Sequence, residues 1–155
     1  MRLALYQPDI PQNTGAVLRL AACFGLAVDI IEPCGFAFDD KRLRRVGMDY
    51  LEHAELRRHS SWAAYLDWRR AAAGDAGRLI LLTTKAVVPY TEAQYGPADS
   101  LLVGQESAGV PEMVRDAADL AVRIPMRPGL RSLNVAMAAA IVAGEAIRQT
   151  GFTGT

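Results

Sequence analysis

The chain has 155 residues, which is enough for one domain with a substantial hydrophobic core. Hydrophobic residues make up 51% of the chain, yet no apolar run is long enough to span a bilayer, and the formal net charge is zero. The lack of a long apolar run excludes a transmembrane helix. The zero net charge excludes binding of nucleic acid through bulk positive charge, so any nucleic-acid partner would have to contact a local basic patch.

Cysteine and histidine usage argues against a metal site or a disulfide framework. Cys23 and Cys34 form no C-x-x-C pair, and these cysteines and the two histidines make no metal-ligand spacing. The first residues, MRLALYQPDIPQ, contain too short an apolar segment before Pro8 for a signal peptide. We therefore expect a metal-free protein with reduced thiols, located in the cytoplasm.

The first part of the chain alternates strand and helix patterns. Apolar runs predict strands at Arg2–Tyr6 and Ala27–Ile31. Between them the spacing predicts a helix that is capped by Asn13, runs to Phe24 and stops at Gly25.

Arg19 lies on the stripe of this helix opposite the predicted core face. Gln12, Gly15 and Ala16 share that stripe, and small residues one turn before Arg19 leave its guanidinium open to a ligand. The spacing fits a solvated surface arginine equally well, so both interpretations stay open at this point.

Two basic clusters are present in this neutral chain. One is Lys41, Arg42, Arg44 and Arg45 on a predicted helix from Asp39 to about Val46, and the other is residues 57–59. Phosphate contact is the commonest specialised use of arginine and lysine, whereas a run of charges is usually a solvated face. Both interpretations remain open from the residues alone.

The rest of the chain continues the same alternation. In order, we predict a helix from Ser60 or Ser61 to about Ala73, a strand at Leu79–Thr83, a short helix or irregular connection at Pro89–Gly96, a strand at Leu101–Val103, a helix near Pro111–Ala118, a strand at Leu120–Ile124, and a final helix from Asn134 to Gln149. Because the final helix is apolar nearly all round, we expect it to be buried on most sides. The pattern predicts a single α/β domain at 1–150 with a mainly parallel sheet of five or six strands flanked by helices, followed by a frayed tail at 151–155.

Two loops that follow predicted strands carry residues suited to ligand binding. The first, in LLVGQESAGVPEMV, has Gly104, Glu106 and Gly109, and glycines at the carboxyl end of a strand let a ligand approach the backbone. The second, in IPMRPGLRSLN, has Arg131 and places Ser132 where a helix N-cap belongs. The pattern G-x-E-x-x-G is not the dinucleotide fingerprint, and the acidic residue expected after that fingerprint is missing, which argues against a nucleotide-binding dehydrogenase. No Walker lysine is present either, so the loop is not a P-loop.

Three blocks of the chain, in this order, carry a resemblance to a known class of enzymes. They are Pro11-Gln-Asn-Thr-Gly15 with Arg19, the loop Gly104–Pro111, and Ile124-Pro125 through Ser132-Leu-Asn134. Together they resemble the three motifs of the SPOUT class of RNA methyltransferases. The segment IEPCGFAFDDKRLRRVGM at 31–48 and the run Leu82-Thr-Thr-Lys85 resemble the small bacterial tRNA 2′-O-methyltransferases that modify the wobble nucleotide of certain leucine tRNAs.

The resemblance, which covers nearly the whole chain, implies a fold, a cofactor and partners. The fold would be the α/β sheet with a deep C-terminal trefoil knot, and the protein would be a homodimer. The cofactor would be S-adenosylmethionine, and the reaction 2′-O-methylation of the wobble cytidine or modified uridine in the anticodon stem-loop of tRNA.

The resemblance also implies roles for individual residues. Catalysis would depend on Arg19 and Asn13. Cofactor binding would involve Leu82, Gly104, Glu106, Gly109, Ile124, Ser132, Leu133 and Asn134. Contacts to RNA would come from Arg131 and from Lys41, Arg42, Arg44 and Arg45.

Two alternatives share parts of this interpretation. One is the same chemistry on ribosomal RNA or on another position of tRNA. The other is a non-catalytic knotted RNA-binding module. The presence of five motif residues argues against it, namely Asn13, Arg19, Glu106, Ser132 and Asn134. Many relatives carry a polar residue shortly after the asparagine of the third motif, where this chain has Ala136 and Met137, so the resemblance implies no direct role for these two side chains.

Overall fold

The computed structural model describes residues 1–37, 55–72 and 75–151. The predicted helix from Asp39 to Val46, with its Lys41, Arg42, Arg44 and Arg45, lies outside the described residues, as does the tail after Gly151. The described elements are, in chain order, β1 (Arg2–Tyr6), α1 (Pro11–Phe24), β2 (Ala27–Ile31), β3 (Leu56–His59), α3 (Trp62–Ala71), β4 (Leu79–Leu82), β5 (Val88–Pro89), β6 (Ser100–Val103), α4 (Glu112–Asp116), β7 (Leu120–Arg123) and α5 (Val135–Thr150).

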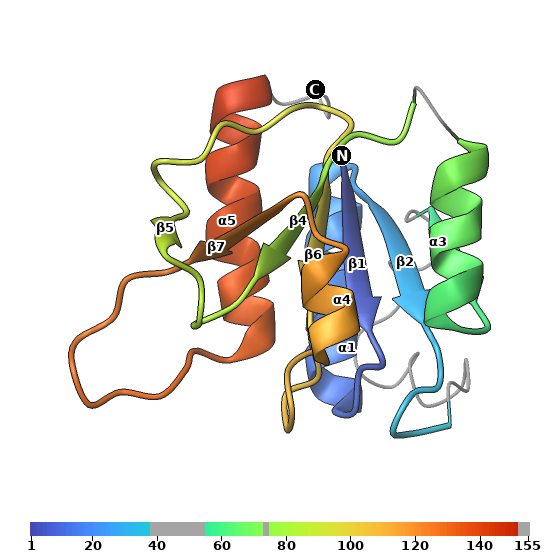
Figure 1. Cartoon of the computed structure of the whole chain (residues 1–155), viewed down its shortest axis with the longest axis horizontal. Helices are drawn as coiled ribbons and strands as arrows, with labels where there is room; N and C mark the ends of the chain where they lie inside the picture. Colours follow the sequence, from blue (N-terminus) through green and yellow to red (C-terminus); the bar gives the residue numbers. More distant parts are fainter. Residues whose placement is uncertain (38–54, 73–74, 152–155) are drawn as a thin grey trace.

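The strands form one parallel sheet in the order β3-β2-β1-β6-β4-β7-β5 (Figure 1). The central strand β1 pairs Arg2 with Ala27 of β2 on one side and with Ser100 of β6 on the other. Every residue of β2 and of β6 is buried, as expected for parallel strands covered on both faces. The predicted mainly parallel α/β sheet is confirmed, with seven strands in the described part of the chain instead of five or six.

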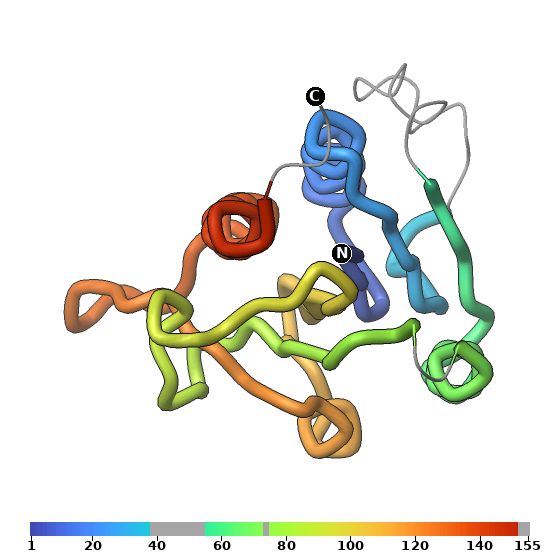
Figure 2. The backbone as a smooth tube through the Cα atoms, turned by 90° about the horizontal axis from the view of Figure 1, so that it is seen from above, coloured from blue at the N-terminus to red at the C-terminus, as the bar shows by residue number. Residues whose placement is uncertain are grey.

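Helices cover both faces of the sheet. Figure 2 shows α1 and α5 on one side, and α3 and α4 on the other. Successive residues of β1 alternate between these layers: Leu3 and Leu5 pack with α1 and α5, while Ala4 and Tyr6 pack with α3 and α4. With both faces covered, the loops at the carboxyl ends of the strands are where a ligand crevice is expected.

The edge strands β3 and β5 were not predicted, because β3 is largely charged and β5 has only the two residues Val88–Pro89. β3 has the sequence LRRH, which was interpreted as a second basic cluster. Its three basic residues have partners inside the fold: Arg57 lies 4.6 Å from the centre of the Trp68 ring, Arg58 pairs with Glu32, and the buried His59 contacts Asp29 at 2.8 Å. These contacts place the cluster at the edge of the sheet, and a phosphate contact by its exposed arginines stays a prediction.

Two predicted helix caps are wrong. Helix α1 begins at Pro11, with Ile10 at its cap position and no side-chain cap bond, so Asn13 lies inside the first turn. Proline suits the first helical position because its missing N–H would have no intrahelical partner there. The N-cap of α5 is Asn134, not Ser132, and the side chain of Asn134 accepts hydrogen bonds from the backbone.

Two other predicted boundaries are confirmed. The hydroxyl of Ser61 caps α3 by accepting a hydrogen bond from the Ala64 amide at 3.1 Å. Gly25 ends α1 in the left-handed region at φ 65°, which glycine adopts without steric cost.

Helix α5 is buried along one stripe. Its fully buried residues are Ala139, Val142, Ala143 and Ala146, which belong to the core shared with α1 and the sheet. Met137 on the outer side is 60% exposed. The prediction that α5 is buried on most sides is therefore wrong for the single chain, because its alanines allow a close approach on one face while the opposite face stays open.

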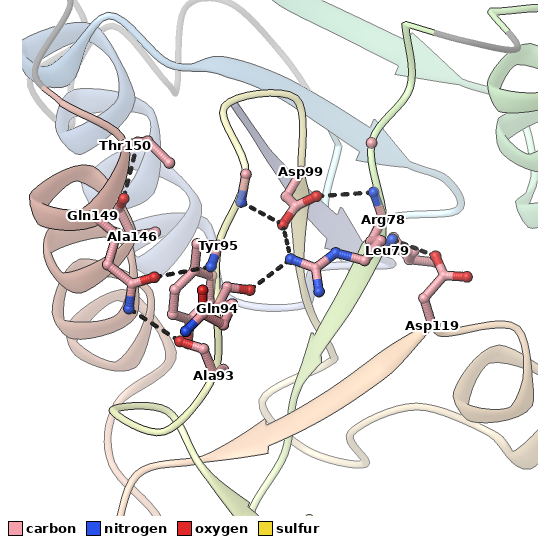
Figure 3. A network of polar contacts seen from close by, with 12 residues as sticks. Arg78, Leu79, Ala93, Gln94, Tyr95, Asp99, Asp119, Ala146, Gln149 and Thr150 are labelled. Carbon is pink, nitrogen blue, oxygen red and sulfur yellow. Dashed lines mark hydrogen bonds and ion pairs between the residues drawn. The ribbon is translucent and has the colours of Figure 1, made fainter.

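The connection between β5 and β6 is irregular and is held at the amino end of the sheet (Figure 3). The side chain of Gln149 accepts a hydrogen bond from the Tyr95 amide and donates one to the Ala93 carbonyl, each at 3.0 Å. The carboxylate of Asp99 accepts a bond from the Arg78 guanidinium at 2.7 Å. These contacts stabilise the amino ends of β4 and β6, opposite the loops that carry the motifs.

Candidate active site

A cavity of about 510 Å³ lies at the carboxyl ends of β4, β6 and β7. Its walls come from the loops after these strands and from the starts of α1 and α5. All residues predicted to bind the cofactor line it, namely Leu82, Gly104, Glu106, Gly109, Ile124, Ser132, Leu133 and Asn134. The predicted catalytic residue Asn13 lines it as well. The fold therefore brings the three motifs, which are far apart in sequence, to one site.

The loop after β6 closes on itself. The Gln105 amide donates to the Gly109 carbonyl at 2.9 Å, and the Gly109 amide donates back at 2.8 Å. A Cβ atom at Gly104 would lie 2.6 Å from the carbonyl carbon of Gly109, and Gly109 itself has a φ of +69°. Both glycines are thus required by the shape of the loop. Their predicted close approach to a cofactor stays a prediction.

Three side chains join the three motifs. The Asn13 amide nitrogen donates to Glu106 Oε1 at 3.1 Å, and the Asn134 amide nitrogen donates to Asn13 Oδ1 at 2.8 Å. Asn134 Oδ1 in turn accepts from the backbone amides of Ala136 and Met137 at 2.9 and 3.3 Å. A single path of hydrogen bonds therefore runs from the loop after β6, through the first turn of α1, to the start of α5.

Glu106 has an acidic neighbour among its hydrogen-bond partners, Asp9, which was not predicted as a site residue. Burial, followed by the hydrogen-bonded Asp9, raises the pKa of Glu106 above its ordinary value. The contact with Glu106 lowers the pKa of Asp9 to about 2. As the pH falls, the pair therefore takes up its first proton on Glu106.

Of the predicted arginines that the structure describes, neither Arg19 nor Arg131 is among the residues that line the cavity. Arg19 lies on the exposed face of α1 with Gln12 and Ala16, whereas Gly15, which was predicted to share that stripe, is buried. Arg131 is exposed in the loop between β7 and α5. Within one chain, Arg19 is therefore separated from the cavity that holds Asn13.

Two cations in the cavity wall were not among the predicted site residues. Lys85 follows β4, and Arg115 lies in the last turn of α4. The run Leu82-Thr-Thr-Lys85 at the end of a strand was a signal for Lys85, whereas nothing in the local pattern pointed to Arg115. With Glu106, these residues place charged groups in a wall that also carries apolar side chains such as Leu82 and Ile124, as is usual for sites that bind small polar molecules.

No group of three or more His, Cys, Asp or Glu side chains in the described ranges could hold a metal ion. No helix in those ranges is long and apolar enough to cross a membrane.

Comparisons with known proteins agree with this arrangement. The model described as the SpoU rRNA Methylase family matches residues 1–144. The chain is 56% identical over 149 residues to a tRNA (cytidine(34)-2′-O)-methyltransferase of Beijerinckia indica, which covers 96% of this chain and 91% of that relative.

Solved structures give the same result. One, described as giving insights into the 2-OH methylation of C/U34 on tRNA, has a TM-score of 0.85 at 40% identity and covers 96% of this chain and 89% of its own. The SpoU methyltransferase AviRb from Streptomyces viridochromogenes, in complex with AdoMet, has a TM-score of 0.86 at 28% identity and covers 96% of this chain and 60% of its own. The chain belongs to the SpoU rRNA methylase family, and its resemblance to the SPOUT-class RNA 2′-O-methyltransferases is confirmed.

Proposed function

We propose that this protein transfers a methyl group from S-adenosylmethionine to the ribose 2′-hydroxyl of nucleotide 34, a cytidine or modified uridine, in tRNA. The observation that carries the proposal is the convergence of the three motifs on one cavity of about 510 Å³. The 56% identity to a relative named for this reaction supports the choice of nucleotide. Leucine tRNAs are the expected substrates, from the resemblance to their wobble-position enzymes.

The residues of the cavity fit S-adenosylmethionine in size and character. Its volume falls in the range of sites for small molecules, and Leu82, Val103 and Ile124 supply apolar surface for a flat base. Gly104 and Ser132 bring backbone and hydroxyl groups to the same wall. When bound, S-adenosylmethionine supplies an electrophilic methyl group carried on a sulfonium. The neighbour AviRb was solved with this cofactor, which supports the assignment.

The residues of the chain would act mainly by positioning. Asn13, Glu106 and Asn134 hold the loops of the cavity in one arrangement through their hydrogen bonds. A fixed arrangement matters because a ribose hydroxyl is a poor nucleophile at neutral pH and gains from orientation and from stabilisation of developing charge.

Arg19 remains the proposed catalytic residue. A guanidinium group offers hydrogen-bond donors and no acceptor, so Arg19 can hold a phosphate and stabilise negative charge on the ribose oxygen. Arg19 is not among the residues that line the cavity of its own chain. It would therefore act on RNA that extends over the α1 face, or at the cavity of a second copy.

The tRNA backbone would meet the cations near the cavity. Arg131 is exposed beside the third motif, and Lys85 and Arg115 line the cavity itself. Lys41, Arg42, Arg44 and Arg45 are proposed to extend this contact, because they concentrate positive charge in a neutral chain. Phosphate contacts of this kind position an RNA without reading its sequence.

We also propose that the protein is a homodimer. Leu130, Leu133 and Met137 are 66%, 41% and 60% exposed, and they follow one another at the rim of the cavity and the start of α5. Exposed apolar side chains grouped in this way are typical of protein interfaces. A second copy would cover them and could bring its own Arg19 to the site.

The trefoil knot stays part of the proposal. The support is the match of nearly the whole chain to the SpoU family, together with the position of the segment 124–134, which carries the chain from β7 past the cavity to α5. Pulling the two ends apart in a single-molecule experiment tests it. A knotted chain would reach a shorter final extension than a fully extended chain of 155 residues.

Nucleoside mass spectrometry tests the proposed reaction. The protein is incubated with S-adenosylmethionine and, separately, with tRNA and ribosomal RNA from cells that lack its gene. The proposal predicts an increase in 2′-O-methylated cytidine or uridine in tRNA alone. An increase confined to ribosomal RNA would show that ribosomal RNA is the substrate. Cofactor binding without methylation of either RNA would favour a non-catalytic RNA-binding module.

A further inference from the structure

Asp9 and Glu106 hold each other through reciprocal hydrogen bonds. The Asp9 amide donates to Glu106 Oε2 at 3.2 Å, and the Glu106 amide donates to Asp9 Oδ1 at 3.0 Å. The hydroxyl of Ser107 donates to the other carboxylate oxygen of Asp9. The loop after β1 is thus clamped to the loop after β6.

A third loop packs on the same residue. Gly35, in the loop after β2, lies so close that a Cβ atom on it would be 2.7 Å from the Cβ atom of Asp9. The Gly35 amide donates to the Pro8 carbonyl at 2.9 Å, which holds this loop in place. Asp9 is therefore the point where the loops after three neighbouring strands, β2, β1 and β6, meet.

The clamp fixes the direction in which the Glu106 carboxylate points. Its Oε2 is used by the Asp9 amide and its Oε1 by the side chain of Asn13. Rotation of this carboxylate would break both bonds. Because the amide nitrogen of Asn13 donates to Glu106, the amide oxygen of Asn13 faces Asn134. Asn134 donates to this oxygen and also caps α5.

We propose that Asp9 is a positioning residue of the methyltransferase site, which holds Glu106 against Asn13 and, through Asn13 and Asn134, keeps the loops of the cavity together. The inference rests on the proposed function. Asp9 does not line the cavity, so it acts through Glu106 and does not touch the ligand.

The two carboxylates of Asp9 and Glu106 should make cofactor binding depend on pH. Asp9 contacts Glu106 directly, and Lys85 and Arg115 are the charged groups among the described residues that share the cavity wall with it. Burial and the neighbouring Asp9 raise the pKa of Glu106, so this carboxylate gains a proton first on acidification. A protonated carboxyl oxygen accepts a hydrogen bond poorly. At acid pH we therefore expect the hydrogen bond from Asn13 to Glu106 to weaken, and with it the connection to Asn134.

Two substitutions separate the clamp from its charge. Asp9→Ala removes the acceptor of the Glu106 amide. Asp9→Asn retains an oxygen for that amide but removes the negative charge, which lowers the pKa of Glu106. Asp116→Ala, at an exposed position of α4 outside the cavity, is the matched control.

The experiment is calorimetric titration of S-adenosylmethionine into the full chain from neutral pH downward, with thermal unfolding of each variant as a folding check. We expect Asp9→Ala to bind about tenfold more weakly, the effect of losing one well-placed hydrogen bond. Asp9→Asn should bind like the wild type at neutral pH and lose affinity only at a lower pH than the wild type does. Asp116→Ala should match the wild type throughout.

The outcomes separate this inference from the proposed function. Two results would overturn the positioning role if the wild type binds the cofactor. One is wild-type affinity in Asp9→Ala, and the other is loss of affinity in Asp9→Asn at the same acid pH as in the wild type. If Asp9→Ala does not fold, the pH at which Asp9→Asn loses affinity for S-adenosylmethionine is sufficient to test the role. Absence of binding in the wild type would reject the proposed function and this inference together.

Discussion

The side-chain amide of Asn134 donates a hydrogen bond of 2.8 Å to the amide oxygen of Asn13, 121 positions earlier in the chain. The same Asn134 side chain caps α5, so one residue both starts a helix and connects it to the first turn of α1. Glu106 extends this connection to the loop after β6. The cavity is therefore held by side chains from all three motifs and not by one local loop.

Substitutions at Asn134 separate its two roles. Asn134→Ala removes the cap and the bond to Asn13, so we expect the free energy of unfolding to fall by about 1 kcal/mol and the affinity for S-adenosylmethionine to decrease. Asn134→Asp keeps a capping oxygen but has no donor for Asn13, so it should lose affinity with little change in stability. Denaturant unfolding and calorimetric titration measure the two effects, and unchanged affinity in Asn134→Asp would contradict the connecting role.

Replacement of glycine by alanine should have opposite effects on the free energy of unfolding at Gly104 and at Gly144. A Cβ atom at Gly104 would lie 2.6 Å from the Gly109 backbone, so Gly104→Ala should destabilise the protein by about 1–3 kcal/mol and disturb the cavity. Gly144 in α5 has nothing within 4 Å of its Cβ position, so Gly144→Ala should stabilise the helix by about 0.5–1 kcal/mol. Denaturant unfolding of both variants tests this, and equal effects would show that the loop after β6 can relax.

Asp9 and Glu106 contribute with opposite signs to the pH dependence of stability. The pKa of Asp9 is lowered from 3.8 to about 2, so its contribution is complete above pH 3.8 and is lost as the pH falls through about 2. The pKa of Glu106 is raised above 4.5, so its contribution decreases as the pH rises from 4.5 through the raised value.

Asp9→Asn should remove the first of these effects and reduce the second. Urea unfolding of the wild type and of Asp9→Asn over a series of pH values measures the free energy of unfolding in each. Parallel profiles for the two proteins would show that the carboxylates do not interact.

Arg19→Ala should reduce methyl transfer to tRNA by at least about 100-fold, because a positioned cation no longer stabilises the developing charge. Its affinity for S-adenosylmethionine should stay unchanged, since Arg19 is not among the residues that line the cavity. Arg19→Lys is the control, which keeps the charge but loses the planar guanidinium. Weakened cofactor binding in Arg19→Ala would instead assign Arg19 a structural role.

A charge on the exposed face near the start of α5 should dissociate the proposed dimer. Met137 is 60% exposed, so Met137→Glu should leave the folded chain intact and yield a monomer in size-exclusion chromatography with light scattering. Val87 is 85% exposed and lies outside the group of Leu130, Leu133 and Met137, so Val87→Glu serves as the control. A wild-type protein that is already monomeric would exclude the dimer.

The sequence predicted the elements whose burial leaves a clear pattern. β2 and β6 are buried at every position and appear as apolar runs, and Gly25 marks the end of α1. β3 was missed because an edge strand with the sequence LRRH takes its charged side chains into contacts with α3 and β2 that no local pattern records.

The candidate site was predicted only in part for a similar reason. The resemblance led to nine residues that the fold brings together in the cavity wall, but it also led to Arg19 and Arg131, which are not among the residues that line it. Asp9 was missed, because its partner Glu106 lies 97 positions away. Asn13 and Ser132 were both predicted as caps, but the caps depend on the path of the chain into each helix, which places Ile10 and Asn134 there instead.

The central claim is methylation of one ribose, and mass spectrometry of nuclease fragments of tRNA after incubation with S-adenosylmethionine tests it most directly. The account predicts one added methyl group on the ribose of nucleotide 34, present with the wild type and strongly reduced with Arg19→Ala. A methyl group at another nucleotide, on a base, or only in ribosomal RNA would contradict it.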